Sequence, residues 1–123
     1  MKRLAIALAL AIAIAVPAAS ALANSITTDS FGCAWTGETY LGSGSIVWGD
    51  THLEPASCGT HVVLWFAYKQ NGTCHYTGAF DEVNTIVSRN ASASGATSSH
   101  QIYVPGNGYG QIITTDYPSA GVC

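Results

Sequence analysis

The stretch THVVLWFAYKQNGTCHYTGAF, residues 60–80, decides the fold class. Two runs rich in β-branched and aromatic residues flank Asn71-Gly72, a dipeptide typical of tight turns between antiparallel strands. The stretch therefore predicts a β-hairpin. A hairpin with one solvated face should alternate between apolar and polar residues, yet both arms are apolar at almost every position. The register between the two arms must therefore decide which face is core.

Two loop lengths give different registers. A two-residue turn at Asn71-Gly72 pairs Gln70 with Thr73 and leaves apolar residues on both faces. A three-residue loop, with Gly72 at a positive φ in a bulge, pairs Lys69 with Thr73 and separates the faces. Because a one-residue slip moves every side chain of one arm across the sheet, we predict the three-residue loop.

The predicted register gives one apolar face, on which Cys74 is expected to point inward. This core face holds Val62, Leu64, Phe66, Tyr68, Cys74, Tyr76, Gly78 and Phe80. The opposite, mixed face holds His61, Val63, Trp65, Ala67, Lys69, Thr73, His75, Thr77 and Ala79. The large, rigid ring of Trp65 suits either a core position under a second sheet or loop, or contact with a binding partner.

The rest of the chain predicts further short strands and no helix after the N-terminal segment. Runs of β-branched and aromatic residues, separated by Gly, Pro, Asn and Asp, occur at 26–35, 39–41, 45–48, 61–69, 73–80, 83–88, 100–104 and 109–115. Residues 90–99, NASASGATSS, are expected to form a loop; the alternative is a strand of small residues that packs tightly. The predicted fold is all-β, a small antiparallel β-sandwich or barrel of about 6–8 short strands.

The N-terminal segment predicts a compartment. Residues 1–23 combine Lys2 and Arg3, an apolar run and a small-residue end, the pattern of a removable secretory signal peptide. The apolar run is shorter than a membrane span requires. We expect a single β domain over residues 24–123, secreted, extracellular or periplasmic, with no membrane attachment after signal removal.

The four cysteines, Cys33, Cys58, Cys74 and Cys123, all follow the predicted cleavage point. An even number in an exported chain indicates two disulfides. Three pairings are possible, and we prefer Cys33 with Cys58 and Cys74 with Cys123, because a cysteine at the last residue clamps an otherwise fraying terminus.

The charge of the mature chain excludes one class of partner. Lys69 and Arg89 are its only basic residues against all seven acidic ones, a formal net charge of about −5. Binding to nucleic acid or to acidic membrane surfaces depends on positive charge and is not expected.

Catalytic signatures are absent from the sequence, so we expect no enzyme activity and assign no catalytic residue and no cofactor. His52 and Glu54 would share one side of an extended segment, and with His61 or His75 they offer metal-ligand types. No third ligand stands at a specific spacing, so no metal site is predicted.

Aromatic and polar side chains near turns and on the mixed face are candidates for binding. Trp48 is expected near a strand end, and two tyrosines flank the Pro-Gly-Asn-Gly turn at 105–108. The candidate binding residues are Trp65, His75, Thr77, Trp48, Tyr103 and Tyr109.

Two short resemblances accompany this interpretation. Trp35-x4-Tyr40-x-Gly42 resembles the aromatic corner of βγ-crystallin-like domains, some of which are secreted inhibitors or toxins. The segment from Cys58 through the hairpin, with the terminal Cys123, is similar in cysteine order to tendamistat-like α-amylase inhibitors, whose Trp-Arg-Tyr turn has no counterpart here. We adopt neither family.

These observations predict a secreted, disulfide-stabilised binding protein, expected to be a monomer. Its expected partner is an extracellular protein, such as a hydrolase that it inhibits, or a cell-surface component; rigid turns reduce the ordering cost of such binding. One alternative is a carbohydrate-binding module that stacks sugars on aromatic rings. Another is a small secreted toxin or hydrolase that uses its histidines and acids.

Overall fold

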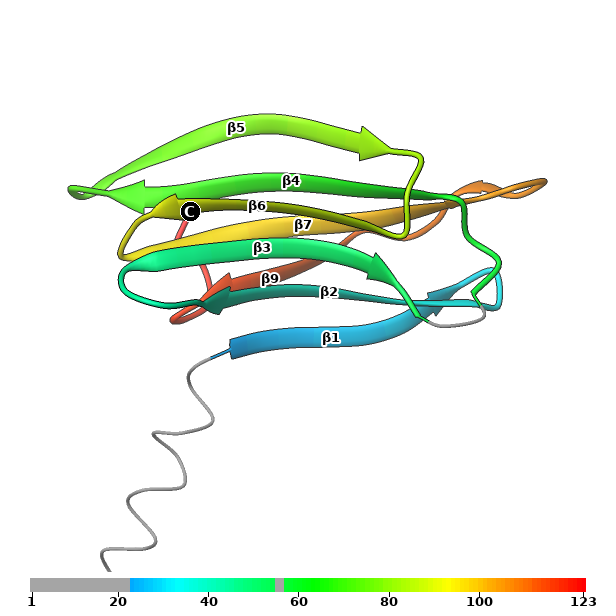
Figure 1. The fold of residues 1–123 in the computed structure, drawn as a ribbon, viewed down its shortest axis with the longest axis horizontal. Helices are drawn as coiled ribbons and strands as arrows, with labels where there is room; N and C mark the ends of the chain where they lie inside the picture. Colours follow the sequence, from blue (N-terminus) through cyan, green and yellow to red (C-terminus); the bar gives the residue numbers. More distant parts are fainter. Residues whose placement is uncertain (1–22, 55–56) are drawn as a thin grey trace, which may run out of the picture.

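The structure, a computed structural model, describes residues 23–54 and 57–123. The predicted signal peptide therefore lies almost wholly outside the described residues. The described chain is all-β, with two antiparallel sheets packed face to face (Figure 1). The predicted sandwich is confirmed. The described residues form nine strands, one above the expected range, because the run predicted at 109–115 forms two strands, β8 (Gly108–Tyr109) and β9 (Ile113–Tyr117). None of the described residues lies in a helix able to cross a membrane.

The two sheets divide the strands unequally. Sheet A has the order β1-β2-β3-β6 and sheet B the order β5-β4-β7, with β8 and β9 both paired to β7. The strands of sheet A are β1 (Ala23–Ser30), β2 (Cys33–Leu41), β3 (Ile46–Leu53) and β6 (Ile86–Ser92). Those of sheet B are β4 (His61–Gln70), β5 (Thr73–Glu82), β7 (Gly95–Val104), β8 (Gly108–Tyr109) and β9 (Ile113–Tyr117).

The apolar core lies between the two sheets, where alternate residues of the strands point inward. Trp35 is its largest side chain; it is fully buried, and its indole N–H donates to Ser30 Oγ at 3.0 Å. The buried apolar cluster comprises Cys33, Trp35, Val47, Val62, Leu64, Phe66, Val87, Ala96, Ile102 and Val104. Trp35 and Tyr40 lie on opposite faces of one continuous strand, so the segment that resembles a βγ-crystallin corner forms no corner.

The predicted three-residue loop of the hairpin is wrong. The turn consists of Asn71 and Gly72 alone, with φ of 51° and 77°, and it pairs Gln70 with Thr73. Asn tolerates a positive φ, so two residues suffice for a turn whose twist matches the strands. The positive φ expected at Gly72 is present.

A bulge in the middle of the hairpin then shifts the register. The pairing slips between Trp65 and Ala67, opposite the segment of β5 that contains Gly78 at φ 87°. Sequence periodicity misplaced the irregularity: with the bulge inside the strand, only the β5 residues between the turn and the bulge differ in face from the prediction.

The register correction changes the face of the β5 residues next to the turn. Val62, Leu64, Phe66, Tyr68 and Phe80 face the core side as predicted. Cys74 and Tyr76 instead lie on the outer face of sheet B, opposite Lys69 and Ala67. His75 moves the other way and stacks against Tyr68, with ring centroids 5.1 Å apart. The hairpin therefore presents a disulfide and an exposed tyrosine outward.

The loop predicted at 90–99 is also wrong, because its residues lie almost entirely in β6 and β7. Ala96 and Ser98 are fully buried against sheet A. The fit is close: a Cβ added at Gly49 would lie 2.3 Å from Ser98 Oγ. The alternative of a tightly packed small-residue strand is the correct one. Since β3 continues through Gly49 to Leu53, Trp48 lies near the start of a strand and not at its last residue.

Both preferred disulfide pairings are confirmed, Cys33–Cys58 and Cys74–Cys123. Cys33 is buried at the start of β2. The second bridge lies on the outer face of sheet B and not in the core, because of the changed hairpin register. There the backbone N–H of Cys123 donates to Thr97 Oγ1 at 2.9 Å, which fixes the C-terminus across β7.

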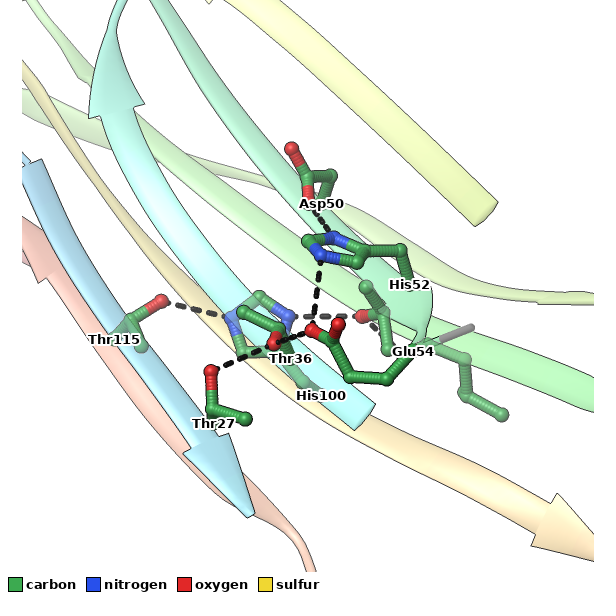
Figure 2. A network of polar contacts seen from close by, with 9 residues as sticks. Thr27, Thr36, Asp50, His52, Glu54, His100 and Thr115 are labelled. Atoms are coloured by element: carbon green, nitrogen blue, oxygen red, sulfur yellow. Dashed lines mark hydrogen bonds and ion pairs between the residues drawn. The ribbon is translucent and has the colours of Figure 1, made fainter. Parts of the chain in front are cut away.

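A series of hydrogen-bonded polar side chains crosses the core between the sheets. His100 of β7 is fully buried; its Nδ1 lies 2.8 Å from Thr51 Oγ1 of sheet A, and its Nε2 lies 2.8 Å from Thr115 Oγ1 of β9 (Figure 2). Thr39 of sheet A extends this series of hydrogen bonds, because its Oγ1 lies 2.7 Å from that of Thr115. Space for the ring comes from Gly37, where an added Cβ would lie 2.4 Å from His100 Cγ.

A neutral imidazole satisfies these hydrogen bonds. Thr51 donates its hydroxyl proton to the Val63 carbonyl oxygen at 2.8 Å, so Thr51 Oγ1 accepts from His100 Nδ1–H. Nε2 is then free to accept from the hydroxyl of Thr115. Burial, which disfavours the charged imidazolium form, is the main cause that lowers the pKa of His100 from 6.5 to about 3. The charge of nearby His52 is the second cause.

This buried histidine predicts acid sensitivity. Between pH 6.5 and about 3 the unfolded chain holds a proton on His100 that the folded chain excludes, so stability falls as pH falls. Loss of about 1.4 kcal/mol per pH unit is expected from this residue in that range. Urea unfolding from pH 7 to 4.5 measures it, with the exposed-histidine variant His75→Gln as control. We expect His75→Gln to keep the wild-type dependence of unfolding free energy on pH and His100→Gln to lose it. The same pH dependence in both variants would contradict the assignment.

The C-terminal bridge predicts a large stability loss on removal. It closes a separation of 49 residues, so the double variant Cys74→Ser/Cys123→Ser should unfold about 4 kcal/mol more easily on the chain-entropy model. Denaturant unfolding of the variant measures this loss. A change below about 1 kcal/mol would show that the terminus is held mainly by its hydrogen bonds.

Candidate functional site

The outer face of sheet B carries the main candidate site. Trp65 of β4 is only partly exposed there and forms part of an open depression of about 290 Å³. The other residues lining it are Phe66, Ala67, Tyr76, Gly78, Thr97, Ser99 and Cys123. Most of this lining is apolar.

Two residues that line the depression, Tyr76 and Cys123, come from different parts of the chain. The bulge beside Trp65 changes the pairing of β5 and leaves Tyr76 74% exposed at the edge strand (Figure 1). Cys123, tied to β5 by its disulfide and to Thr97 by its backbone, closes one end. Strands and a covalent bridge thus hold the lining in place before any ligand arrives.

Polar groups around the depression already have partners. Thr97 Oγ1 donates to Asp116, and Ser99 Oγ lies 3.1 Å from Thr114 Oγ1. Gln101 Nε2 donates to the carbonyl oxygen of Gly110 at 2.8 Å. These bonds lock the rim, and they reduce the number of donors free to hold a polar ligand.

An aromatic cluster lies on the same face, about four residues further along β4 and β7, roughly 13 Å away. Tyr103 contacts His61 and Tyr109, with ring centroids 4.9 and 5.0 Å apart. Asp81 accepts from the hydroxyl of Tyr109 and lies 3.2 Å from His61 Nδ1. The bond to Asp81 raises the pKa of the exposed Tyr109 hydroxyl above its usual value.

Three of the six predicted binding residues share this face: Trp65, Tyr103 and Tyr109. The others lie elsewhere. His75 packs on Tyr68 on the opposite side of sheet B, and Thr77 donates to the Phe66 carbonyl oxygen at 2.8 Å within the bulge.

Trp48, the remaining predicted residue, belongs to the outer face of sheet A. It pairs across the sheet with Tyr40 and Asn90, and it is partly exposed. The two tryptophans of the binding prediction thus point away from the molecule on opposite sides and cannot contact one small ligand together.

The outer face of sheet A also holds a polar network that sequence analysis only partly anticipated. Asp50, His52 and Glu54 follow one another at alternate positions of one extended segment. His52 Nδ1 lies 2.9 Å from Asp50 Oδ1, and its Nε2 lies 3.6 Å from Glu54 Oε1 (Figure 2). Thr36 donates to Glu54 and contacts Thr27 at 2.8 Å.

Glu38 joins this network from the neighbouring strand, directly opposite Asp50. Burial, followed by repulsion from and hydrogen bonding to Asp50, raises the pKa of Glu38 above its usual range. Burial and the same carboxylate raise the pKa of Tyr40. The cluster therefore concentrates negative charge.

Sequence reasoning had one signal for this network, His52-x-Glu54. Asp50 and Glu38 were missed, since they meet only through the β2–β3 register.

Comparison of the chain with protein-family models, with curated proteins and with solved structures finds no match. The chain is a small, disulfide-bonded all-β protein whose fold and two bridges are compatible with a secreted binding protein.

Proposed function

We propose that this protein is a secreted binding protein that holds an apolar side chain of an extracellular protein partner in the depression beside Trp65. The observation that carries the proposal is an apolar, preformed hollow on a sheet face, lined by Trp65, Ala67 and Tyr76. Aromatic residues around a desolvated hollow are typical of the positions that dominate binding energy between proteins.

Rigidity supports the same function. The Cys74–Cys123 bridge and the strands fix the lining, so little conformational entropy is lost when a partner binds. The rim hydroxyls of Thr97 and Ser99 already bond to β9 residues. An apolar anchor needs none of these groups, whereas a sugar ring requires several free donors and acceptors.

A carbohydrate ligand is the second candidate, favoured by the distribution of aromatic rings. Trp65 and Tyr76 on one side, and Tyr103 and Tyr109 on the other, lie along a single face. An elongated glycan that stacks on both groups would bridge them. A protein anchor needs only the depression, so the two candidates differ in their dependence on Tyr109.

The proposal predicts that removal of the Tyr76 side chain weakens binding. Tyr76 is 74% exposed, so Tyr76→Ala should leave the fold intact while it opens the depression. The partner is first captured from culture fluid on the immobilised protein, and its Kd is then measured by biolayer interferometry. We expect at least a tenfold increase in Kd, a typical effect for a residue at the centre of an interface.

A matched variant removes an equally exposed apolar side chain elsewhere. Val83, 77% exposed between β5 and β6, lies away from the depression, and Val83→Ser should leave Kd unchanged. Equal Kd values for the wild type, Tyr76→Ala and Trp65→Ala would contradict the proposed site. Retention on a polysaccharide column that is lost in Tyr109→Ala, without capture of any protein, would favour the carbohydrate function.

A further inference from the structure

The outer face of sheet A brings together three metal-ligand side chains from two strands. Glu38 of β2 lies opposite Asp50 of β3, and His52 is two residues further along the same face of β3. One donor atom from each of the three residues lies within 4.8 Å of the others. We propose that Glu38, Asp50 and His52 bind a divalent transition-metal ion, of which Zn²⁺ is the representative probe.

The distance between the first two ligand atoms already suits a metal. Two atoms bound to one ion at about 2.1 Å are separated by about 3.0 to 3.4 Å in octahedral or tetrahedral geometry. His52 Nδ1 and Asp50 Oδ1 are 2.9 Å apart and share a hydrogen bond, whose proton the metal ion would displace. Glu38 is only partly buried, so rotation of its flexible side chain brings the third oxygen to the same point.

The charge of the cluster favours a cation. The Asp50 side chain is 5% exposed, and the carboxyl groups of Glu38 and Glu54 are close to it or to His52. Within the described residues no lysine or arginine forms an ion pair with these three acids; Arg89 pairs with Glu82 at 3.0 Å. His52, 2.9 Å from Asp50, can carry positive charge, and a bound cation would further offset the cost of a buried carboxylate surrounded by like charge.

A further part of this polar network lies on the far side of the imidazole. A histidine that ligates a metal through one nitrogen usually donates the other N–H to a carboxylate, which fixes the tautomer. Here Nε2 of His52 faces Glu54 Oε1 at 3.6 Å, and Glu54 is held by the hydroxyl of Thr36. Metal at Nδ1 would place the ring proton on Nε2, directed at Glu54. Figure 2 shows Glu54 and Asp50 on the two sides of the His52 ring.

The donor set selects the class of ion. One imidazole nitrogen with two carboxylate oxygens suits Zn²⁺ and its first-row neighbours, whereas Ca²⁺ requires six to eight oxygen ligands. Three protein ligands on an outer sheet face leave at least one coordination position for water. This site is separate from the depression of sheet B, so the metal proposal does not depend on the proposed function.

Calorimetric titration of the purified protein with zinc chloride tests the proposal. We expect one Zn²⁺ per chain, no saturable binding of calcium chloride, and at least tenfold weaker Zn²⁺ binding in both Glu38→Gln and His52→Gln. Glu54→Gln, which alters only the partner of His52, should weaken binding by about tenfold with unchanged stoichiometry. Co²⁺ in place of Zn²⁺ should give a visible absorption spectrum that is lost in His52→Gln.

The control is His75→Gln, because His75 is an exposed histidine on the other sheet. Zn²⁺ binding should be unchanged in this variant, and thermal melts without metal should show that each variant is folded. The proposal is overturned by absence of saturable Zn²⁺ binding, by equal affinity in wild type, Glu38→Gln and His52→Gln, or by loss of binding in His75→Gln. Calcium binding as tight as zinc binding would overturn the transition-metal assignment.

Discussion

The hydrogen-bonded imidazole of His100 is the constraint on which the packing of the two sheets depends. A neutral ring inside the core joins Thr51 of sheet A to Thr115 of sheet B, and each of its nitrogens has one partner. An unpaired polar group there would be costly, so the sheets must meet with β3, β7 and β9 in one alignment. Gly37 supplies the space for the ring. Apolar packing alone tolerates sliding between layers, whereas these directional bonds do not.

The alignment of the sheets fixes what each outer face presents. Because side chains alternate along a strand, Thr51 inside the core places Asp50 and His52 outside on sheet A. Likewise His100 inside places Ser99 and the other odd-numbered residues of β7 outside on sheet B. The apolar depression and the acidic cluster therefore lie on opposite sides of one molecule. Each is held by strands, and the first is held by a disulfide as well.

Sequence patterns predicted the parts of this structure that depend on local chemistry. Strand composition indicated an all-β sandwich, and the position of Cys123 indicated its pairing with Cys74. For Trp65 the sequence left a core position and a partner contact both open, and the structure shows a partly exposed side chain. The predictions were wrong where contacts between residues far apart in the sequence decide the structure. Small residues at 90–99 resemble a loop until Gly49 and Ser98 are seen to pack against each other.

The sequence by itself determined most of the strand-forming segments, the acidic charge and the paired cysteines. Only the tertiary structure decided the hairpin register, the inward position of His100 and the meeting of Glu38 with Asp50. The physical reason is the two-residue period of a strand, in which one bulge reverses the face of every residue beyond it. Whether a bulge forms depends on packing between segments far apart in the chain, and no local pattern records that packing.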